Sequence, residues 1–163
     1  VLGSCVSACI RDKETGLGGM NHFMLPANKE EARGILKRLE PTGANRYGNF
    51  AMESLINDIL KNGGKRKNLE VKITGGGKIL QHMTNIGEMN IKFVEDYIDS
   101  EGLNLIGSDV GDVYPRKVMY IPSTGAVKVK KLKKLHNNMV IEREGKYMED
   151  IIKKPVVGVI ELF

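Results

Sequence analysis

The stretch Gly3-Ser4-Cys5-Val6-Ser7-Ala8-Cys9-Ile10 alternates small and apolar residues, and this alternation predicts a β-strand over Val6–Ile10. Asp12-Lys13-Glu14-Thr15-Gly16 then reads as a turn, and Leu17–Leu25 as the return strand of a hairpin that Pro26 ends. Such a hairpin places Cys5 and His22 on neighbouring strands. We therefore expect the Cys5 sulfur and a His22 ring nitrogen to lie within about 4 Å of each other.

A cysteine beside a histidine forms a nucleophile, because the imidazole takes the thiol proton and the thiolate attacks a carbonyl carbon. A free cysteine has a pKa of about 8.5, and a neighbouring imidazolium lowers it by several units. The spacing alone also allows a buried cysteine that packs as a small hydrophobe beside a core histidine. A zinc site made from Cys5, Cys9 and His22 does not fit the close-pair spacing that zinc ligands usually show.

The composition is that of an ordinary globular domain. Its 163 residues are 41% hydrophobic and 28% charged, which is enough for one domain with a proper core. No apolar run approaches the roughly 20 residues of a transmembrane helix, and the start lacks the features of a signal peptide. The chain opens inside a strand-like pattern without an initiator methionine, so we expect natural residues upstream of Val1.

The two cysteines predict a reducing compartment. On one strand, Cys5 and Cys9 face the same way but lie about 13 Å apart, at about 3.3 Å per residue. A disulfide needs Cα atoms within about 7 Å of each other. Free thiols in a domain without disulfides favour the cytoplasm.

The net charge is +5, from 25 Lys and Arg against 20 Asp and Glu, and it is unevenly spread. Five lysines lie within seven residues: Lys128, Lys130, Lys131, Lys133 and Lys134. They allow a nucleic-acid patch or a solvated strand edge. Since aromatics are only 6% and no stacking motif accompanies the lysines, the solvated edge is favoured and no nucleic-acid partner is expected.

Two amphipathic helices are predicted. The first runs over Arg46–Lys61, with Asn45 as its cap and Gly63-Gly64 after its end, and the second over Gly87–Asp99. A polar segment over 27–43, with a short helical stretch over Glu30–Leu39, is expected to be a surface loop. Near the C-terminus, a short helix is predicted over Tyr147–Ile152, followed by an apolar stretch over Val156–Phe163.

Strands are predicted over Leu69–Thr74, Leu103–Ser108, Lys117–Ile121 and Ala126–Leu132. Together with the hairpin they outnumber the helices. This excess predicts a single α/β domain, a layered β/β/α sandwich with mixed sheets and the two main helices on one side. It argues against a doubly wound parallel sheet.

The run Thr74-Gly75-Gly76-Gly77-Lys78 invites a phosphate-loop interpretation. It lacks the spacing of that motif, and Ile79 stands where a magnesium-binding hydroxyl belongs. A turn at a strand end, where the backbone approaches the wall of the active site, is the favoured interpretation.

Six segments in this order resemble the CheD family of chemoreceptor glutamine deamidases. They are Gly3-Ser4-Cys5, Met20-Asn21-His22-Phe23-Met24-Leu25-Pro26, Arg46-Tyr47-Gly48-Asn49-Phe50-Ala51-Met52, Lys72-Ile73-Thr74-Gly75-Gly76-Gly77, Asn85-Ile86-Gly87-Glu88-Met89-Asn90 and Asp109-Val110-Gly111-Asp112-Val113-Tyr114-Pro115-Arg116-Lys117. The resemblance covers about residues 1–132 and the closing Val159–Phe163. It implies a single deamidase domain over 1–163, with a core over 1–132 and a C-terminal extension over 133–163.

The resemblance implies that Cys5 is the nucleophile and His22 its base. In the family a threonine six residues before the cysteine completes a triad, and here that position lies before Val1. Ser4 is a poor substitute, because adjacent strand residues point to opposite faces.

The chemistry of amide hydrolysis fits these residues. The Cys5 thiolate attacks the glutamine amide, His22 protonates the departing ammonia, and water then hydrolyses the thioester. The backbone N–H groups around Gly3 to Cys5, including that of Ser4, are candidates for the oxyanion site, with Asn21 as a candidate side-chain donor. Asn21 equally fits a role in ordering the hairpin. No metal or organic cofactor is required.

The resemblance also implies partners. The helical cytoplasmic part of chemoreceptors is the expected substrate, and the protein is expected to be cytoplasmic without membrane insertion. The alternative is a non-catalytic adaptor or regulator that binds the CheC phosphatase and receptors.

Overall fold

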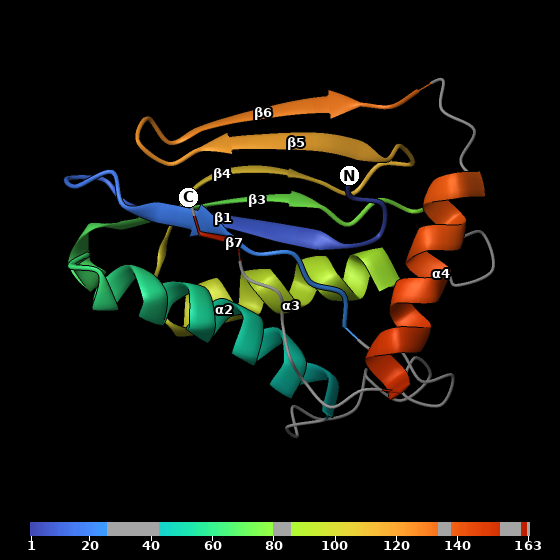
Figure 1. The fold of residues 1–163 in the computed structure, drawn as a ribbon, viewed down its shortest axis with the longest axis horizontal. Helices are drawn as coiled ribbons and strands as arrows, with labels where there is room; N and C mark the ends of the chain where they lie inside the picture. Colours follow the sequence, from blue (N-terminus) through green and yellow to red (C-terminus); the bar gives the residue numbers. More distant parts are fainter. Residues whose placement is uncertain (26–42, 80–85, 134–137, 154–160, 163) are drawn as a thin grey trace.

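The computed structural model describes residues 1–25, 43–79, 86–133, 138–153 and 161–162. It has three layers, with a two-stranded sheet above a five-stranded sheet and two helices below (Figure 1). The strands are β1 (Val6–Asp12), β2 (Gly18–Met20), β3 (Leu69–Gly75), β4 (Asn104–Val110), β5 (Arg116–Ile121), β6 (Ala126–Lys131) and β7 (Glu161–Leu162). The helices are α2 (Gly43–Lys61), a short 3-10 turn η1 (Arg66–Asn68), α3 (Ile86–Ser100) and α4 (Asn138–Lys153).

The larger sheet has the strand order β4-β3-β1-β2-β7 and is mixed. Its centre is β1, which pairs antiparallel with β2 and with β3, whereas β3 and β4 are parallel. The crossover from β3 to β4 is α3, as a parallel connection requires. The smaller sheet is the antiparallel hairpin β5–β6, and Ile121↔Ala126 is its last residue pair before the turn. The predicted layered α/β sandwich with mixed sheets is confirmed.

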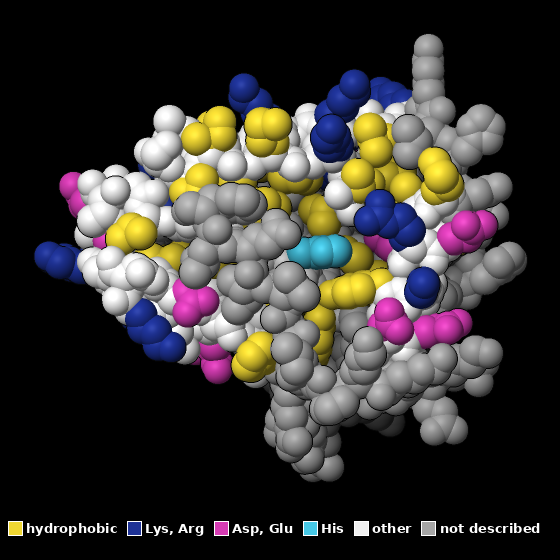
Figure 2. Space-filling view, viewed as in Figure 1, with side chains coloured by type: hydrophobic (Ala, Val, Ile, Leu, Met, Phe, Trp, Pro, Cys, Tyr) yellow, Lys and Arg dark blue, Asp and Glu magenta, His cyan; other side chains and the backbone are white. Residues whose placement is uncertain are grey.

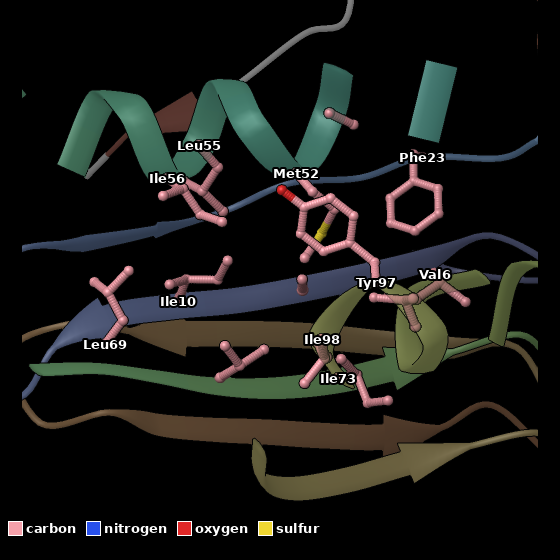
Figure 3. Close-up of a cluster of buried hydrophobic side chains, with 14 of the residues drawn as sticks. Val6, Ile10, Phe23, Met52, Leu55, Ile56, Leu69, Ile73, Tyr97 and Ile98 are labelled. Carbon is pink, nitrogen blue, oxygen red and sulfur yellow. The ribbon is translucent and has the colours of Figure 1, made fainter. Parts of the chain in front are cut away.

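The main core lies between the larger sheet and its helices. Alternation along β1 turns Val6, Ala8 and Ile10 toward this core, and all three are fully buried. Figure 3 shows Met52, Leu55 and Ile56 of α2 on the side of the sheet to which Val6 and Ile10 point. The remaining labelled side chains of that view come from the loop after β2, from β3 and from α3: Phe23, Leu69, Ile73, Tyr97 and Ile98. The prediction that both amphipathic helices cover one side of the sheet is confirmed (Figure 1).

Several predicted boundaries need correction. Helix α2 already begins at Gly43, so Asn45 lies in its first turn and is not the residue that precedes the helix. The return strand of the hairpin is shorter than Leu17–Leu25, since regular pairing stops at Met20 and resumes only as a bridge between Val6 and Phe23. The predicted helical stretch over Glu30–Leu39 lies outside the described residues.

The largest difference is α4, which spans 16 residues where a short helix over Tyr147–Ile152 was predicted. It is a third long helix, and it packs across one end of the layers and not beneath the sheet (Figure 1). Its buried face contains the carboxylate of Glu144 between Val140 and Met148. A charged residue in an apolar stripe breaks the helical pattern that sequence analysis depends on.

The hairpin turn between β1 and β2 is held by Asp12. Its carboxylate accepts hydrogen bonds from the backbone N–H groups of Glu14, Thr15 and Lys65, and from the Asn68 side chain. Burial by itself raises the pKa of this carboxyl, but the hydrogen bonds outweigh it and lower the pKa to about 2. The turn is thereby tied to the segment that leads into β3.

Within the described residues, no helix combines the length and the apolar character needed to cross a membrane.

Candidate active site

Cys5 and His22 stand at the same end of the β1–β2 hairpin. Cys5 directly precedes β1, and His22 follows β2 by two residues. Val6 and Phe23 exchange backbone hydrogen bonds at 3.1 and 3.0 Å. Continuing this register sets Ser7 opposite His22, so Cys5 and His22 share one face as a diagonal pair. Diagonal neighbours lie about 7–8 Å apart, a separation that an aromatic ring such as that of His22 can span. The predicted sulfur-to-nitrogen distance of about 4 Å stays a prediction.

A cavity of about 420 Å³ is lined by both residues. The Cys5 side chain is only 2% exposed and forms its floor, whereas His22 is exposed. On the face shown in Figure 2, the histidine side chain, in cyan, lies open to solvent among hydrophobic side chains. The far wall comes from α4, through Val140, Glu144 and Tyr147. The C-terminal segment is therefore part of this cavity.

The glycine run Gly75–Gly77, at the end of β3 and just after it, holds the backbone around Cys5. The N–H of Gly76 donates to the carbonyl oxygen of Cys5 at 2.7 Å, and that of Gly77 to the carbonyl oxygen of Gly3 at 2.7 Å. Gly75 and Gly76 have φ of +114° and +66°, which favour glycine. A side chain on Gly75 would overlap the Cys5 carbonyl. The interpretation as a close-approach turn is confirmed, and the run packs on protein backbone.

Asn90, on the buried face of α3, joins the two halves of the site. Its side-chain N–H donates to the carbonyl oxygen of Ser4, and its side-chain oxygen accepts from the N–H of Leu25, both at 2.8 Å. The residue is fully buried. It therefore fixes the loop that carries Cys5 relative to the segment that carries His22. Its role was not predicted, although an Asn on the apolar stripe of a helix was the available signal.

Arg116 anchors the other side of the same loop. Its backbone exchanges two hydrogen bonds with Leu2, both at 2.7 Å, so the first residues pair with β5. Its side chain is fully buried and forms an ion pair with Asp109 at 3.2 Å. This residue too was not recognised from the sequence, since the rest of its strand is only partly buried.

Glu144 of α4 binds the residues directly before Cys5. Its Oε1 accepts a hydrogen bond from the N–H of Gly3 at 2.8 Å. Its Oε2 accepts from the N–H of Ser4 at 2.9 Å and from the Ser4 hydroxyl at 2.5 Å. The two backbone N–H groups expected to form an oxyanion site thus converge on one anion. Glu144 was not predicted, because it lies about 140 residues from its partners in the chain.

The thiol of Cys5 is strongly perturbed. Burial raises its pKa well above the usual value, and the charge of Glu144 with a hydrogen bond to that carboxylate raises it further. The second cysteine, Cys9, lies on the same face of β1, where burial raises its pKa to about 12. Both cysteines are free thiols. In this arrangement Cys5 is held as the neutral thiol at ordinary pH.

The ring of Tyr147, on α4, stacks against the ring of His22. The two rings stack with centroids 5.5 Å apart and an angle of 10° between their planes. The Tyr147 hydroxyl lies 2.9 Å from that of Tyr47 on α2. Burial, followed by this contact with Tyr47, raises the pKa of Tyr147, so the phenol stays neutral. The imidazole of His22 thus lies between the hairpin and α4.

Asn21 is occupied within the fold. Its side-chain oxygen accepts from the N–H of Ala8 at 2.8 Å, and its N–H₂ donates to the Ala51 carbonyl oxygen and the Met52 sulfur. It is 1% exposed. These contacts favour the role in ordering the hairpin over that of an oxyanion donor.

Comparison with known proteins shows which family this chain resembles in sequence. The family model described as CheD chemotactic sensory transduction matches residues 24–131. Cys5 and His22 precede the matched segment, whereas Asn90 and Arg116 lie within it.

Individual relatives match the whole chain. A protein of Hydrogenovibrio crunogenus named as a probable chemoreceptor glutamine deamidase CheD is 52% identical over 163 residues, covering 100% of this chain and 83% of the relative. Proteins with the same name from Methylobacillus flagellatus and Hahella chejuensis are 52% and 49% identical. They too are matched over 100% of this chain, and over 79% and 75% of their own lengths. The similarity therefore includes both the hairpin and α4.

Proposed function

This chain belongs to the CheD family, and on that premise we propose that it deamidates glutamine side chains of chemoreceptors, with Cys5 as nucleophile and His22 as base. The observation that carries the proposal is the placement of these two residues on one face of the hairpin, at one cavity. A thiol and an imidazole at the wall of a cavity are the groups that covalent amide hydrolysis needs. The relatives' printed names supply the substrate class.

The reaction proceeds in two halves. His22 accepts the Cys5 thiol proton, and the thiolate sulfur bonds to the amide carbon of the glutamine. The carbonyl electron pair moves onto oxygen and then returns, the C–N bond breaks, and the proton on His22 leaves with the nitrogen as ammonia. A water molecule, deprotonated by His22, then attacks the thioester. The C–S bond breaks, the thiol is regenerated, and the glutamine amide has become a glutamate carboxylate.

The negative oxygen formed in both halves needs donors that are already in place. The N–H groups of Gly3 and Ser4 are the proposed donors, since they already bind the two carboxylate oxygens of Glu144, one each, at 2.8 and 2.9 Å. One such donor is typically worth about 3 kcal/mol of transition-state stabilisation. The hydrogen bonds from Asn90 and the glycine run hold the loop so that these donors need not reorganise.

The site of action is proposed to be the cytoplasm, on the helical cytoplasmic part of a chemoreceptor. A second proposed role, carried by family resemblance, is binding to the CheC phosphatase through a surface that includes the same cavity. Substitution of Cys5 distinguishes a purely adaptor role from a catalytic one. An adaptor tolerates Cys5→Ala, whereas an enzyme loses its activity.

The test is incubation of a chemoreceptor cytoplasmic fragment with the protein, followed by peptide mass spectrometry. Each converted glutamine is recognised by the mass change from amide to acid. Conversion of particular glutamines by the wild type, and none by Cys5→Ser, is the expected result. Unchanged glutamines after prolonged incubation with folded wild-type protein would contradict the proposed function.

A further inference from the structure

Helix α4 brings a glutamyl side chain to the thiol of Cys5. Glu144 is 6% exposed, and three hydrogen bonds from Gly3 and Ser4 hold its two carboxylate oxygens. All three donors belong to the two residues that directly precede Cys5. The proposed reaction acts on a glutamyl side-chain carbonyl at this same place.

The pattern of donors fits the product of the reaction better than its substrate. A carboxylate accepts hydrogen bonds at both oxygens, whereas a glutamine amide accepts at only one. With an amide in this position, an N–H₂ donor replaces one of the two oxygens and would face a backbone N–H of Gly3 or Ser4. Glu144 therefore occupies the site in the way a newly formed glutamate would.

The surroundings of Glu144 are those of a helix seated in a groove. Val140 and Met148, one turn before and one turn after it, are buried in a cluster with Leu2 and Cys5. Tyr147, three residues on, stacks against His22. The spacing i, i+3, i+4 places all of them on one face of α4. As the proposed substrate is also a helix, α4 and a receptor helix would compete for one surface.

We propose that α4 is an internal product analogue, in which Glu144 fills the glutamyl subsite formed by Gly3 and Ser4 and keeps a receptor helix out until α4 moves away. This inference rests on the proposed function and adds to it how the substrate is presented: as a glutamine on a helix, with apolar residues one turn to either side. It also assigns a regulatory role to the C-terminal segment. The neutral state of the Cys5 thiol under α4 agrees with an inhibited form.

The sharpest test places a glutamine at position 144, so that the chain itself carries the side chain to be deamidated. In Glu144→Gln the Cys5 thiolate attacks the amide carbon of the new side chain, ammonia leaves with a proton from His22, and water releases glutamate from the thioester. The variant is purified in the full chain, and the peptide containing position 144 is followed by mass spectrometry over time. The matched control is Glu142→Gln, an exposed position on the same helix. A second control carries Glu144→Gln together with Cys5→Ala.

Conversion of the glutamine at 144 in the single variant, with none at 142 and none without Cys5, is the expected result. An amide at 144 that persists in a preparation that still deamidates a receptor fragment would overturn the inference and leave the proposed function intact. Failure of the folded wild type to convert the receptor fragment, together with an amide at 144 that persists, would refute the proposed function, and the inference with it.

The inhibitory role has its own readout. Glu144→Ala in the full chain removes a carboxylate that accepts three hydrogen bonds, so the rate on the receptor fragment at subsaturating concentration should rise by at least about tenfold, the scale for the loss of a single charge-assisted hydrogen bond. Glu142→Ala should leave that rate unchanged. A Glu144→Ala rate at or below that of the wild type, in protein with a normal melting transition, would show that α4 does not compete with substrate.

Discussion

The side-chain N–H of Asn90 donates a hydrogen bond to the carbonyl oxygen of Ser4 at 2.8 Å, so a residue of α3 fixes the peptide next to Cys5. Asn90 also binds the N–H of Leu25, three residues after His22. One buried side chain thus sets the relative position of the two proposed catalytic residues. It is a positioning residue, since it touches neither the cavity nor the reacting atoms.

Asn90→Leu should lower both stability and activity. The substitution leaves the Ser4 carbonyl and the Leu25 N–H buried without partners, at a cost of about 1–3 kcal/mol each in the free energy of unfolding. Denaturant unfolding measures this cost, and deamidation rates measure the loss of alignment. Lys92→Leu, at an exposed position of the same helix, is the control and should change stability by at most about 0.5 kcal/mol. Equal stability of the two variants would contradict the bridging role of Asn90.

Gly75→Ala should be worse than Gly63→Ala, although the two backbones are alike. Their φ values are +114° and +102°, so an added side chain is strained at both, by about 1–3 kcal/mol. At Gly63 the new methyl group meets nothing within 4 Å, whereas at Gly75 it meets the carbonyl of Cys5. We expect a further loss of at least about 1 kcal/mol and of activity at Gly75 only. Thermal melts and deamidation assays of the pair decide this, and identical effects would argue against support of Cys5 by the glycine run.

The reactivity of Cys5 should depend steeply on pH. Burial and the charge of Glu144 raise its pKa, so the alkylation rate should climb tenfold per pH unit through the neutral range, where the thiol is protonated. Glu144→Ala removes the negative charge and lowers the pKa, which shifts the profile to lower pH. Cys9, with a pKa of about 12 set mainly by burial, is the internal reference and should not shift. Alkylation followed peptide by peptide measures both cysteines in one experiment. An equal shift of both pH profiles would mean that the substitution in α4 alters the whole fold and not Cys5 alone.

His22→Ala should separate catalysis from folding. The side chain is exposed, and its stacking on Tyr147 is worth about 0.5–1.5 kcal/mol, so the domain should remain folded. Loss of a general base should reduce the deamidation rate by about 10²–10⁴-fold. Added imidazole should restore part of the rate, because it supplies the missing proton acceptor. A variant that works as well as the wild type would remove His22 from the mechanism.

The layers of the fold were predictable from the sequence because they depend on local periodicity. Alternation in β1 and the helical spacing in α2 and α3 each report one buried face, and the β/β/α order follows from them. The hairpin likewise placed Cys5 and His22 together, since residues on paired strands need only a turn to meet. The close approach of Gly75 to Cys5 was also foreseeable from three successive glycines at a strand end.

The rest of the site depends on contacts between distant segments. Asn90 and Glu144 are polar residues on buried helix faces, where periodicity analysis counts them as interruptions. Their hydrogen-bond partners lie 86 and about 140 residues away in the chain. No feature of the neighbouring sequence indicates which residues those partners are. For the same reason α4 was predicted too short and treated as an extension, although it closes the cavity.

Replacement of either cysteine tests directly whether the Cys5 thiol converts receptor glutamine to glutamate. Cys5→Ala and Cys9→Ala each remove one buried thiol from the same face of the hairpin, so they cost similar packing. The time course of glutamine conversion in a receptor cytoplasmic fragment is measured by mass spectrometry for both variants and the wild type. We expect conversion by Cys9→Ala at a rate within a few-fold of the wild type and none by Cys5→Ala. Conversion by folded Cys5→Ala at the wild-type rate would contradict this expectation.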